Sequence, residues 1–232
     1  MRIDGKTFAS MCDVGTWHAL ATKAEVDNAI AVAKEYKACS IYTPKCFCKY
    51  AAEQLKGTGI NLEFSICAST GHDDVEHKVF GAKRYVELGL TEVETYLNLS
   101  FFKSKMYKEA YEDILAVRKA IPEDMIMKCI IQTPVLDDEE LKIASQMCVD
   151  AGVNFVKTGN GQFGLTTKHA LEVIANTVQG KAQIKATGPF VNAKMIYDFL
   201  EVGATRFGIG VGEMIELCRI IDADYATGEE QY

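Results

Sequence analysis

The chain has 232 residues, of which 48% are hydrophobic and 25% are charged, a composition typical of one soluble domain with a large core. The formal net charge of -7 argues against nucleic acid or an anionic membrane as a partner, because both need clustered lysine and arginine. No apolar run is long enough to span a bilayer, and the first residues lack the apolar stretch of a signal peptide. We therefore expect a single cytoplasmic domain over residues 1–232.

The eight cysteines are expected to be reduced rather than paired in disulfides. Five lie inside apolar segments, where a thiol behaves as a small hydrophobe: Cys39, Cys67, Cys129, Cys148 and Cys218. Cys46 and Cys48 form a short metal-like fragment, but no second pair of cysteines or histidines follows at zinc-finger spacing. The sequence therefore predicts no metal site.

Short apolar or β-branched runs alternate with amphipathic helical stretches along the whole chain, the pattern of a parallel sheet with helical crossovers. The expected strands are 10–12, 38–42, 61–66, 92–97, 125–131, 155–157, 183–186 and 206–208. Eight such units in this length favour a closed TIM (β/α)8 barrel in the α/β class. The alternative fold is an open dinucleotide-binding sheet. That fold has a glycine-rich turn after its first strand and an acidic residue at the end of its second strand, and this sequence has neither.

Capping residues and glycines mark several helices between these strands. The expected N-caps are Thr22, Asp73, Asp137 and Asn192. Glycines that cannot continue a helix cheaply follow the last three of these helices: Gly89, Gly152 and Gly203. The helix after Thr22 is expected over 23–36, and the helix after Asp73 is expected to run to Leu88.

Two expected strands end in a lysine that is followed within three residues by glycine, in 155–159 and 182–188. In a barrel the carboxyl ends of neighbouring strands meet, so Lys157 and Lys185 should lie close together. A lysine can attack a carbonyl at pH 7 only when its pKa falls by about 3 units, or about 4 kcal/mol.

A second ammonium about 5 Å away supplies roughly 3 kcal/mol of repulsion at an effective dielectric near 20, and desolvation can supply the rest. One neutral and one charged lysine suit a Schiff-base enzyme. The structural alternative, surface or ion-paired lysines, is disfavoured because two occur at consecutive strand ends.

Seven segments spread over most of the chain share their order and spacing with one known family. They are Asp13 with Thr16, 42–45, 89–94, 128–131, 154–164, 184–188 and 203–208. Together they resemble the deoxyribose-phosphate aldolase family. The resemblance implies a class I aldolase on a β/α barrel that reversibly cleaves 2-deoxyribose 5-phosphate to acetaldehyde and glyceraldehyde 3-phosphate without a metal or other cofactor.

The resemblance also implies roles for individual residues. The catalytic set comprises Lys157 as the Schiff-base lysine, Lys185 as the lysine that perturbs it, Glu94 in the proton relay, Lys128 near Glu94, and Tyr232 as a terminal proton shuttle. The expected substrate-binding residues are Asp13, Thr16, Thr158, Gly159, Gln162, Thr187, Gly188, Gly208 and Gly210. The implied partners are a small aldehyde and a sugar phosphate, and the family resemblance is compatible with a homodimer.

The chain departs from the family at the proton relay and on the phosphate side. Glu94 stands where the family has aspartate, which adds one methylene. Where the family has a phosphate-contacting lysine, this chain has Gln162. Where the family has a glycine with a free N–H, this chain has Pro189, and where it has two serines, this chain has Gly210 and Val211. The possibility of a substrate with a different or uncharged tail therefore stays open. Glycine amides after residue 207 can still bind an anion at a helix start.

Two other functions also stay open. In one, the barrel is a lyase or isomerase that uses Lys157 as a general base; in the other, it is a catalytically weak binding protein. Borohydride trapping separates the first from an aldolase, because only an iminium is reduced to a stable secondary amine. Tight binding without turnover would favour the second.

Overall fold

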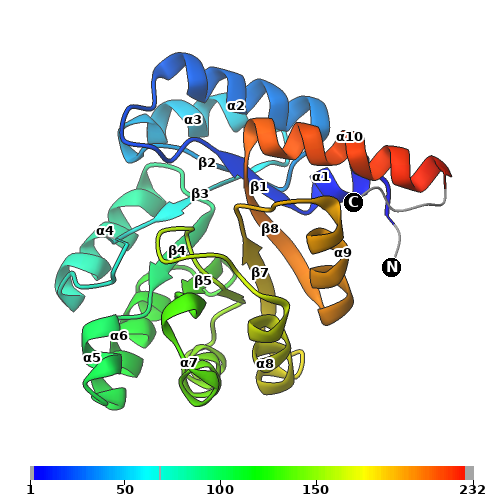
Figure 1. Cartoon of the computed structure of the whole chain (residues 1–232). Coiled ribbons are helices and arrows are strands. Elements are labelled where there is room, and N and C mark those ends of the chain that lie inside the picture. The colour runs from blue at the N-terminus through cyan, green and yellow to red at the C-terminus, as the bar shows by residue number, and fades with distance from the viewer. Residues whose placement is uncertain (1–2, 68, 228–232) are drawn as a thin grey trace.

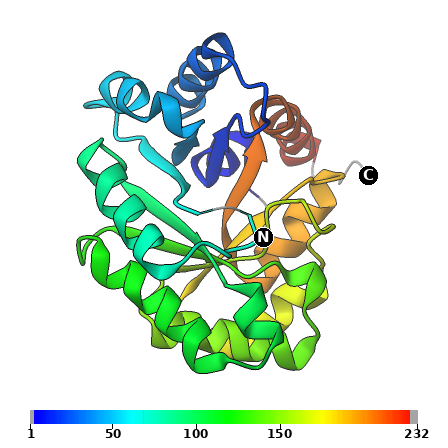
Figure 2. The ribbon, with the colours of Figure 1, turned by 90° about the vertical axis from the view of Figure 1, so that its left-hand side faces the viewer.

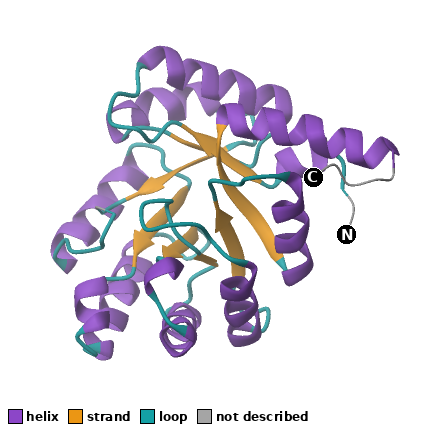
Figure 3. Ribbon diagram, viewed as in Figure 1, coloured by secondary structure: helices purple, strands orange, loops and turns teal. Residues whose placement is uncertain are grey.

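The computed structural model describes residues 3–67 and 69–227, and within them eight parallel strands close into a barrel in chain order. The strands are β1 (Cys12–Gly15), β2 (Ser40–Tyr42), β3 (Asn61–Ser65), β4 (Glu92–Tyr96), β5 (Ile126–Ile130), β6 (Phe155–Lys157), β7 (Gln183–Thr187) and β8 (Ala204–Gly210). Helices surround them on the outside (Figures 1 and 3). The predicted TIM barrel is thereby confirmed.

One short helix precedes the first strand, and the other helices follow strands along the chain. They are α1 (Gly5–Ser10), α2 (Lys23–Tyr36), α3 (Cys48–Leu55), α4 (Val75–Glu87), α5 (Leu99–Lys103), α6 (Tyr107–Ala120), α7 (Asp138–Asp150), α8 (Lys168–Val178), α9 (Ala193–Val202) and α10 (Val211–Thr227), with short 3-10 turns η1 (Lys45–Phe47) and η2 (Thr133–Val135). None of the helices described is long and apolar enough to cross a membrane.

Three predicted N-caps are confirmed, and one is wrong by one residue. Thr22, Asp137 and Asn192 each accept a hydrogen bond from a backbone amide of the first turn. Asp74 rather than Asp73 caps α4, because Asp74 has the extended backbone of a cap and accepts from the His77 amide at 3.0 Å.

The first expected strand, 10–12, is also wrong in part. Ser10 ends a helix whose start is capped by Asp4, and this helix buries Phe8 and Ala9. The strand begins only at Cys12. The short α1 packs beside the C-terminal helix α10, as Figure 2 shows, and the Gly5 amide donates to Asp222 Oδ1 at 2.7 Å.

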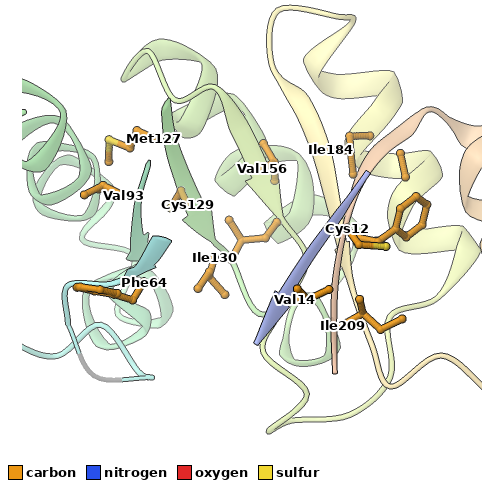
Figure 4. Packing of buried hydrophobic residues seen from close by; sticks show 14 of the residues in the cluster. Cys12, Val14, Phe64, Val93, Met127, Cys129, Ile130, Val156, Ile184 and Ile209 are labelled. Carbon is orange, nitrogen blue, oxygen red and sulfur yellow. The ribbon is translucent and has the colours of Figure 1, made fainter. Parts of the chain in front are cut away.

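Strand side chains alternate between two layers. Apolar residues such as Val14, Val93 and Val156 are fully buried in the layer between strands and helices, part of which Figure 4 shows. Residues one position away point to the barrel interior, and many of these are charged, for example Asp13 and Glu94. Parallel register sets Glu94 opposite Lys128 and Lys157 opposite Lys185. The barrel interior is thus a polar core inside an apolar shell.

Most of the cysteines lie in the apolar shell, and Cys46 is exposed. Every one of them is a free thiol. Cys67, Cys129, Cys148 and Cys218 are buried as predicted, whereas Cys39 is only half-buried.

A buried ion pair outside the barrel holds the loop that follows β3. Lys78 on α4 donates to the Gly71 carbonyl at 2.7 Å and to Asp113 on α6 at 2.5 Å, and both charged side chains are fully buried. This loop also contains Ser69, which lines a cavity at the carboxyl ends of the strands. The pair therefore ties one wall of the cavity to two outer helices.

We expect Lys78→Met to cost about 3–5 kcal/mol in the free energy of unfolding, because it leaves the buried Asp113 carboxylate without its cation. The double variant Lys78→Met/Asp113→Leu should regain most of that loss, since the unpaired charge is gone. Urea denaturation measures both. Lys108→Met, which removes an exposed partner of Glu112, is the control and should change stability by less than about 0.5 kcal/mol.

Candidate active site

A cavity of about 520 Å³ opens at the carboxyl ends of the strands. Seven of the strands contribute residues to its wall, among them Asp13, Tyr42, Ser65, Tyr96, Lys157, Thr187 and Gly208. The carboxyl end of a β/α barrel is where enzymes of this fold carry their active sites. The cavity is therefore the candidate active site.

Eight buried charges lie at and beneath the floor of this cavity, and each residue is less than a tenth exposed. Four are carboxylates, namely Asp13, Glu63, Glu92 and Glu94, and four are cations, namely Lys128, Lys157, Lys185 and Arg206. Their formal charges cancel. Burying one charge without a partner would be costly, so these side chains stabilise one another as a set.

Lys157 and Lys185 meet at one oxygen atom. The Nζ atoms of both lysines donate to Oε1 of Glu94 at 2.8 Å, so at most about 5.6 Å separates the two nitrogens. Lys157 also donates to Oε2 of Glu94 at 2.7 Å. The expected juxtaposition of the two amines is present in the structure.

The two lysines have opposite pKa shifts. Burial lowers the pKa of Lys157, the charge of Lys185 lowers it further, and the pull of Glu94 in the other direction does not cancel these effects. Burial would also lower the pKa of Lys185, but Asp13, Glu63 and Glu94 together hold it well above its usual range. Lys157 is thus the amine that loses its proton more readily, and Lys185 stays charged.

The main cause of the lowered pKa of Lys157 differs from the one expected from the sequence. The sequence-based interpretation attributed most of the lowered pKa to repulsion from a second ammonium, whereas burial is the larger cause for Lys157. The intervening carboxylate of Glu94 also has a pKa held low, because Lys157, Lys185 and Lys128 outweigh the effect of its own burial. A carboxylate between two amines dampens their repulsion and makes desolvation the decisive effect.

Lys128 lies below the cavity wall and not in it. It is fully buried and pairs with Asp13 at 2.7 Å, with Glu92 at 2.5 Å and with Glu63. The oxygens of these three carboxylates lie within 4.8 Å of one another, a spacing that also suits a metal ion. The Lys128 ammonium binds all three and so supplies the positive charge that this cluster needs.

Asp13 links the layer around Lys128 to the layer around Lys157. Its two oxygens accept from Lys128, from Lys185 at 2.6 Å and from Arg206 at 2.6 Å. The Arg206 guanidinium also lies 5.0 Å from the centre of the Phe155 ring. Asp13 therefore orients Lys185 as well as facing the cavity.

The predicted substrate-binding residues divide into two groups. Those that line the cavity are Asp13, Thr187, Gly188 and Gly208. Gly208 packs closely against Lys185, since a Cβ there would lie 3.2 Å from Cε of Lys185. The Thr187 hydroxyl is buried and has no hydrogen-bond partner among the described residues, which leaves it available to a ligand.

The other predicted residues are not part of the cavity wall: Thr16, Thr158, Gly159, Gln162 and Gly210. Thr158 instead accepts from the Thr187 amide at 3.1 Å and contacts the Thr166 hydroxyl at 2.8 Å, which ties neighbouring loops together. Gln162 lies in an exposed loop. Tyr232 lies outside the described residues.

Sequence reasoning missed several residues of the site. Glu63, Glu92 and Arg206 received no role, although each is a charged residue with an apolar neighbour in a strand, as in Leu62-Glu63-Phe64. A charged residue beside an apolar one in a strand indicates a side chain that points into the barrel, because neighbouring side chains point to opposite sides. Tyr96, whose pKa is raised to about 12 by burial and by Glu94, also lines the cavity and accepts from Asn160 at 3.3 Å.

Comparison with known proteins gives related enzymes over most of the chain. The deoxyribose-phosphate aldolase of Bacillus subtilis (strain 168) is 32% identical over 211 residues, covering 90% of this chain and 92% of that protein. The one of Thermoanaerobacter pseudethanolicus is 35% identical over 199 residues, covering 84% and 89%. A crystal structure of a putative deoxyribose-phosphate aldolase from Coccidioides immitis superposes with a TM-score of 0.87 at 25% identity, covering 94% and 87%. No protein-family model matches the chain.

Replacing Lys185 with Met should raise the pKa of Lys157. The repulsion from Lys185 is lost, and Glu94 no longer shares its charge with a second lysine. The neutral fraction of Lys157 at pH 7 then falls, so borohydride trapping of acetaldehyde should begin about one pH unit higher or more. Mass spectrometry of the reduced protein across a pH series measures this, and an unchanged profile would contradict the expectation. Lys185→Arg keeps the charge and serves as the control.

Proposed function

Since the chain belongs to the deoxyribose-phosphate aldolase family, we propose that it is a class I aldolase, a carbon–carbon lyase that cleaves 2-deoxyribose 5-phosphate to acetaldehyde and glyceraldehyde 3-phosphate. The observation that carries the proposal is the Lys157 amine, which reaches the cavity, is desolvated, and lies beside a second lysine that stays charged. This is the arrangement needed for a nucleophilic amine at neutral pH.

In the proposed reaction Lys157 attacks the aldehyde carbon, C1, of the open-chain sugar. Loss of water from the carbinolamine leaves an iminium, whose positive carbon accepts electrons. A base removes the proton of the C3 hydroxyl, the C2–C3 bond breaks, and its electron pair moves into the iminium to give an enamine. Glyceraldehyde 3-phosphate leaves as C3 becomes a carbonyl. Protonation of the enamine at C2 and hydrolysis then release acetaldehyde and restore the amine.

Glu94 is proposed to direct the proton transfers. Its carboxylate touches the Nζ of Lys157, so it lies next to every species that this nitrogen forms. Because its pKa is held low, Glu94 orients a water that carries the proton rather than keeping the proton itself. The hydrogen bond from Ser65 to Oε2 of Glu94, 3.1 Å long, keeps the carboxylate in this position.

Other groups at the cavity wall are suited to bind the sugar hydroxyls. The buried Thr187 hydroxyl without a described partner is one, and Asn160 beside Tyr96 is another. Burial raises the pKa of both Tyr42 and Tyr96, so each keeps its proton and can donate a hydrogen bond. Asp13 and Lys128 are positioning residues in this scheme, because they act on Lys185 and on each other through hydrogen bonds.

We also propose that the chain works as one barrel domain in the cytoplasm and self-associates as a homodimer. The free thiols support a reducing compartment, since buried unpaired cysteines in this number are typical of proteins that never meet an oxidising one. The homodimer is supported only by the family resemblance.

Reduction with borohydride in the presence of acetaldehyde should attach one ethyl group to Lys157. Peptide mass spectrometry locates the adduct, and the buried Lys128 should stay unmodified in the same sample. Lys157→Met should abolish the adduct and lower cleavage of 2-deoxyribose 5-phosphate by about 1,000-fold or more. An adduct on Lys185 with Lys157 unmodified, or full turnover by Lys157→Met, would refute the proposal.

Glu94→Gln should separate the two effects of this carboxylate. Glu94 raises the pKa of Lys157, so removing its charge lowers that pKa further and should extend acetaldehyde trapping to lower pH. Turnover should nevertheless fall by about 100-fold, because the proton transfers lose their carboxylate. Trapping and steady-state assays over one pH series measure both. Ser65→Ala, which removes a hydrogen bond to Glu94 and no charge, is the matched control.

A further inference from the structure

Part of the cavity wall is formed by the start of α10. This helix begins at Val211, directly after β8 ends at Gly210, and it runs for 17 residues. Its amino end carries a partial positive charge and free backbone amides, which favour an anion. In β/α barrels the loops after strands seven and eight commonly bind a phosphate in this way.

An acidic side chain of the protein itself already lies in this position. Glu213, in the first turn of α10, is half-buried and lines the cavity. Its Oε1 accepts a hydrogen bond of 2.6 Å from the amide of Phe190, in the loop after β7. Its Oε2 lies 3.8 Å from where a Cβ on Gly210 would be. The carboxylate thus lies between the two loops whose amides would hold a phosphate.

The cavity wall offers little positive charge to offset this carboxylate. Its cationic side chains are Lys45, Lys157 and Lys185. Lys157 and Lys185 are already paired with Glu94. Lys45 lies in η1, after β2, and burial lowers its pKa. In the loop between Gly188 and Phe190, Pro189 has no amide to donate. A phosphate at the start of α10 would therefore meet the Glu213 charge directly.

We propose that Glu213 is a specificity-determining residue, whose carboxylate occupies the anion position at the start of α10 and reduces the advantage of a phosphorylated over an unphosphorylated sugar. The inference rests on the proposed aldolase function and concerns the tail of the same substrate. A phosphate must displace Glu213 from the Phe190 amide or lie beside it, and either event costs binding energy. A hydroxyl tail lets Glu213 stay and donates one hydrogen bond to it.

The test compares kcat/KM for 2-deoxyribose 5-phosphate and for 2-deoxyribose in three proteins. Glu213→Gln keeps the side-chain shape and the acceptor for Phe190 but removes the charge. We expect its phosphate-to-hydroxyl preference to rise at least about tenfold over that of the wild type, mainly through a lower KM for the phosphorylated sugar. Glu216→Gln is the control, since Glu216 lies on the same helix, is exposed and pairs with Arg219. Its preference should change by less than about twofold.

Binding of inorganic phosphate, measured by isothermal titration calorimetry, separates this inference from the catalytic proposal. Glu213→Gln should bind phosphate at least about tenfold more tightly than the wild type and Glu216→Gln do. Unchanged phosphate binding together with an unchanged substrate preference would overturn the role of Glu213 and leave the aldolase function intact. Tighter phosphate binding in a protein that cleaves neither sugar would support Glu213 as the occupant of the anion position and refute the proposed reaction.

Discussion

Charge balance in the barrel interior is the constraint on which the site depends. Four carboxylates and four cations are buried together, and removal of any one of them leaves the set with a net buried charge. The two lysines differ in how many carboxylates they contact. Lys185 contacts Asp13, Glu63 and Glu94, whereas the one carboxylate that Lys157 contacts among the described residues is Glu94, which it shares. This difference in the number of carboxylate partners decides which lysine loses its proton and so which one is fit to attack a carbonyl.

The barrel and its reactive lysines were predictable because their signals are local. Alternating apolar runs and helix caps are read within about a dozen neighbouring residues, and a lysine at a strand end is visible in the same window. The counter-charges were not predictable in this way. Asp13 and Arg206 are 193 positions apart in the chain, and Lys185 and Glu63 are 122 apart. Only closure of the barrel brings such residues together, so Glu63, Glu92 and Arg206 were missed.

Some expected site residues lie outside the cavity wall for a related reason. A motif places residues at a strand end but does not say which way each side chain points. Lys157 and Thr158 are adjacent, yet Lys157 faces the cavity and Thr158 holds two loops together. Alternation explains this difference, because neighbours in an extended chain point to opposite sides. The same rule applied to every strand would have placed Thr158 outside the cavity wall and added Glu63 to the buried charges.

Two parts of the site tolerate change to different degrees. Around Lys157, the side chains are held by strand register and by charge balance, so a substitution at Lys128 or Lys185 removes one of the cations that three buried carboxylates share. At the start of α10, Glu213 is half-buried and its described hydrogen bond is to one backbone amide. Altering that residue upsets no buried network. The proposed Schiff-base chemistry therefore depends on the barrel strands, whereas the proposed recognition of the substrate tail depends on a loop and a helix start that can vary without disturbing them.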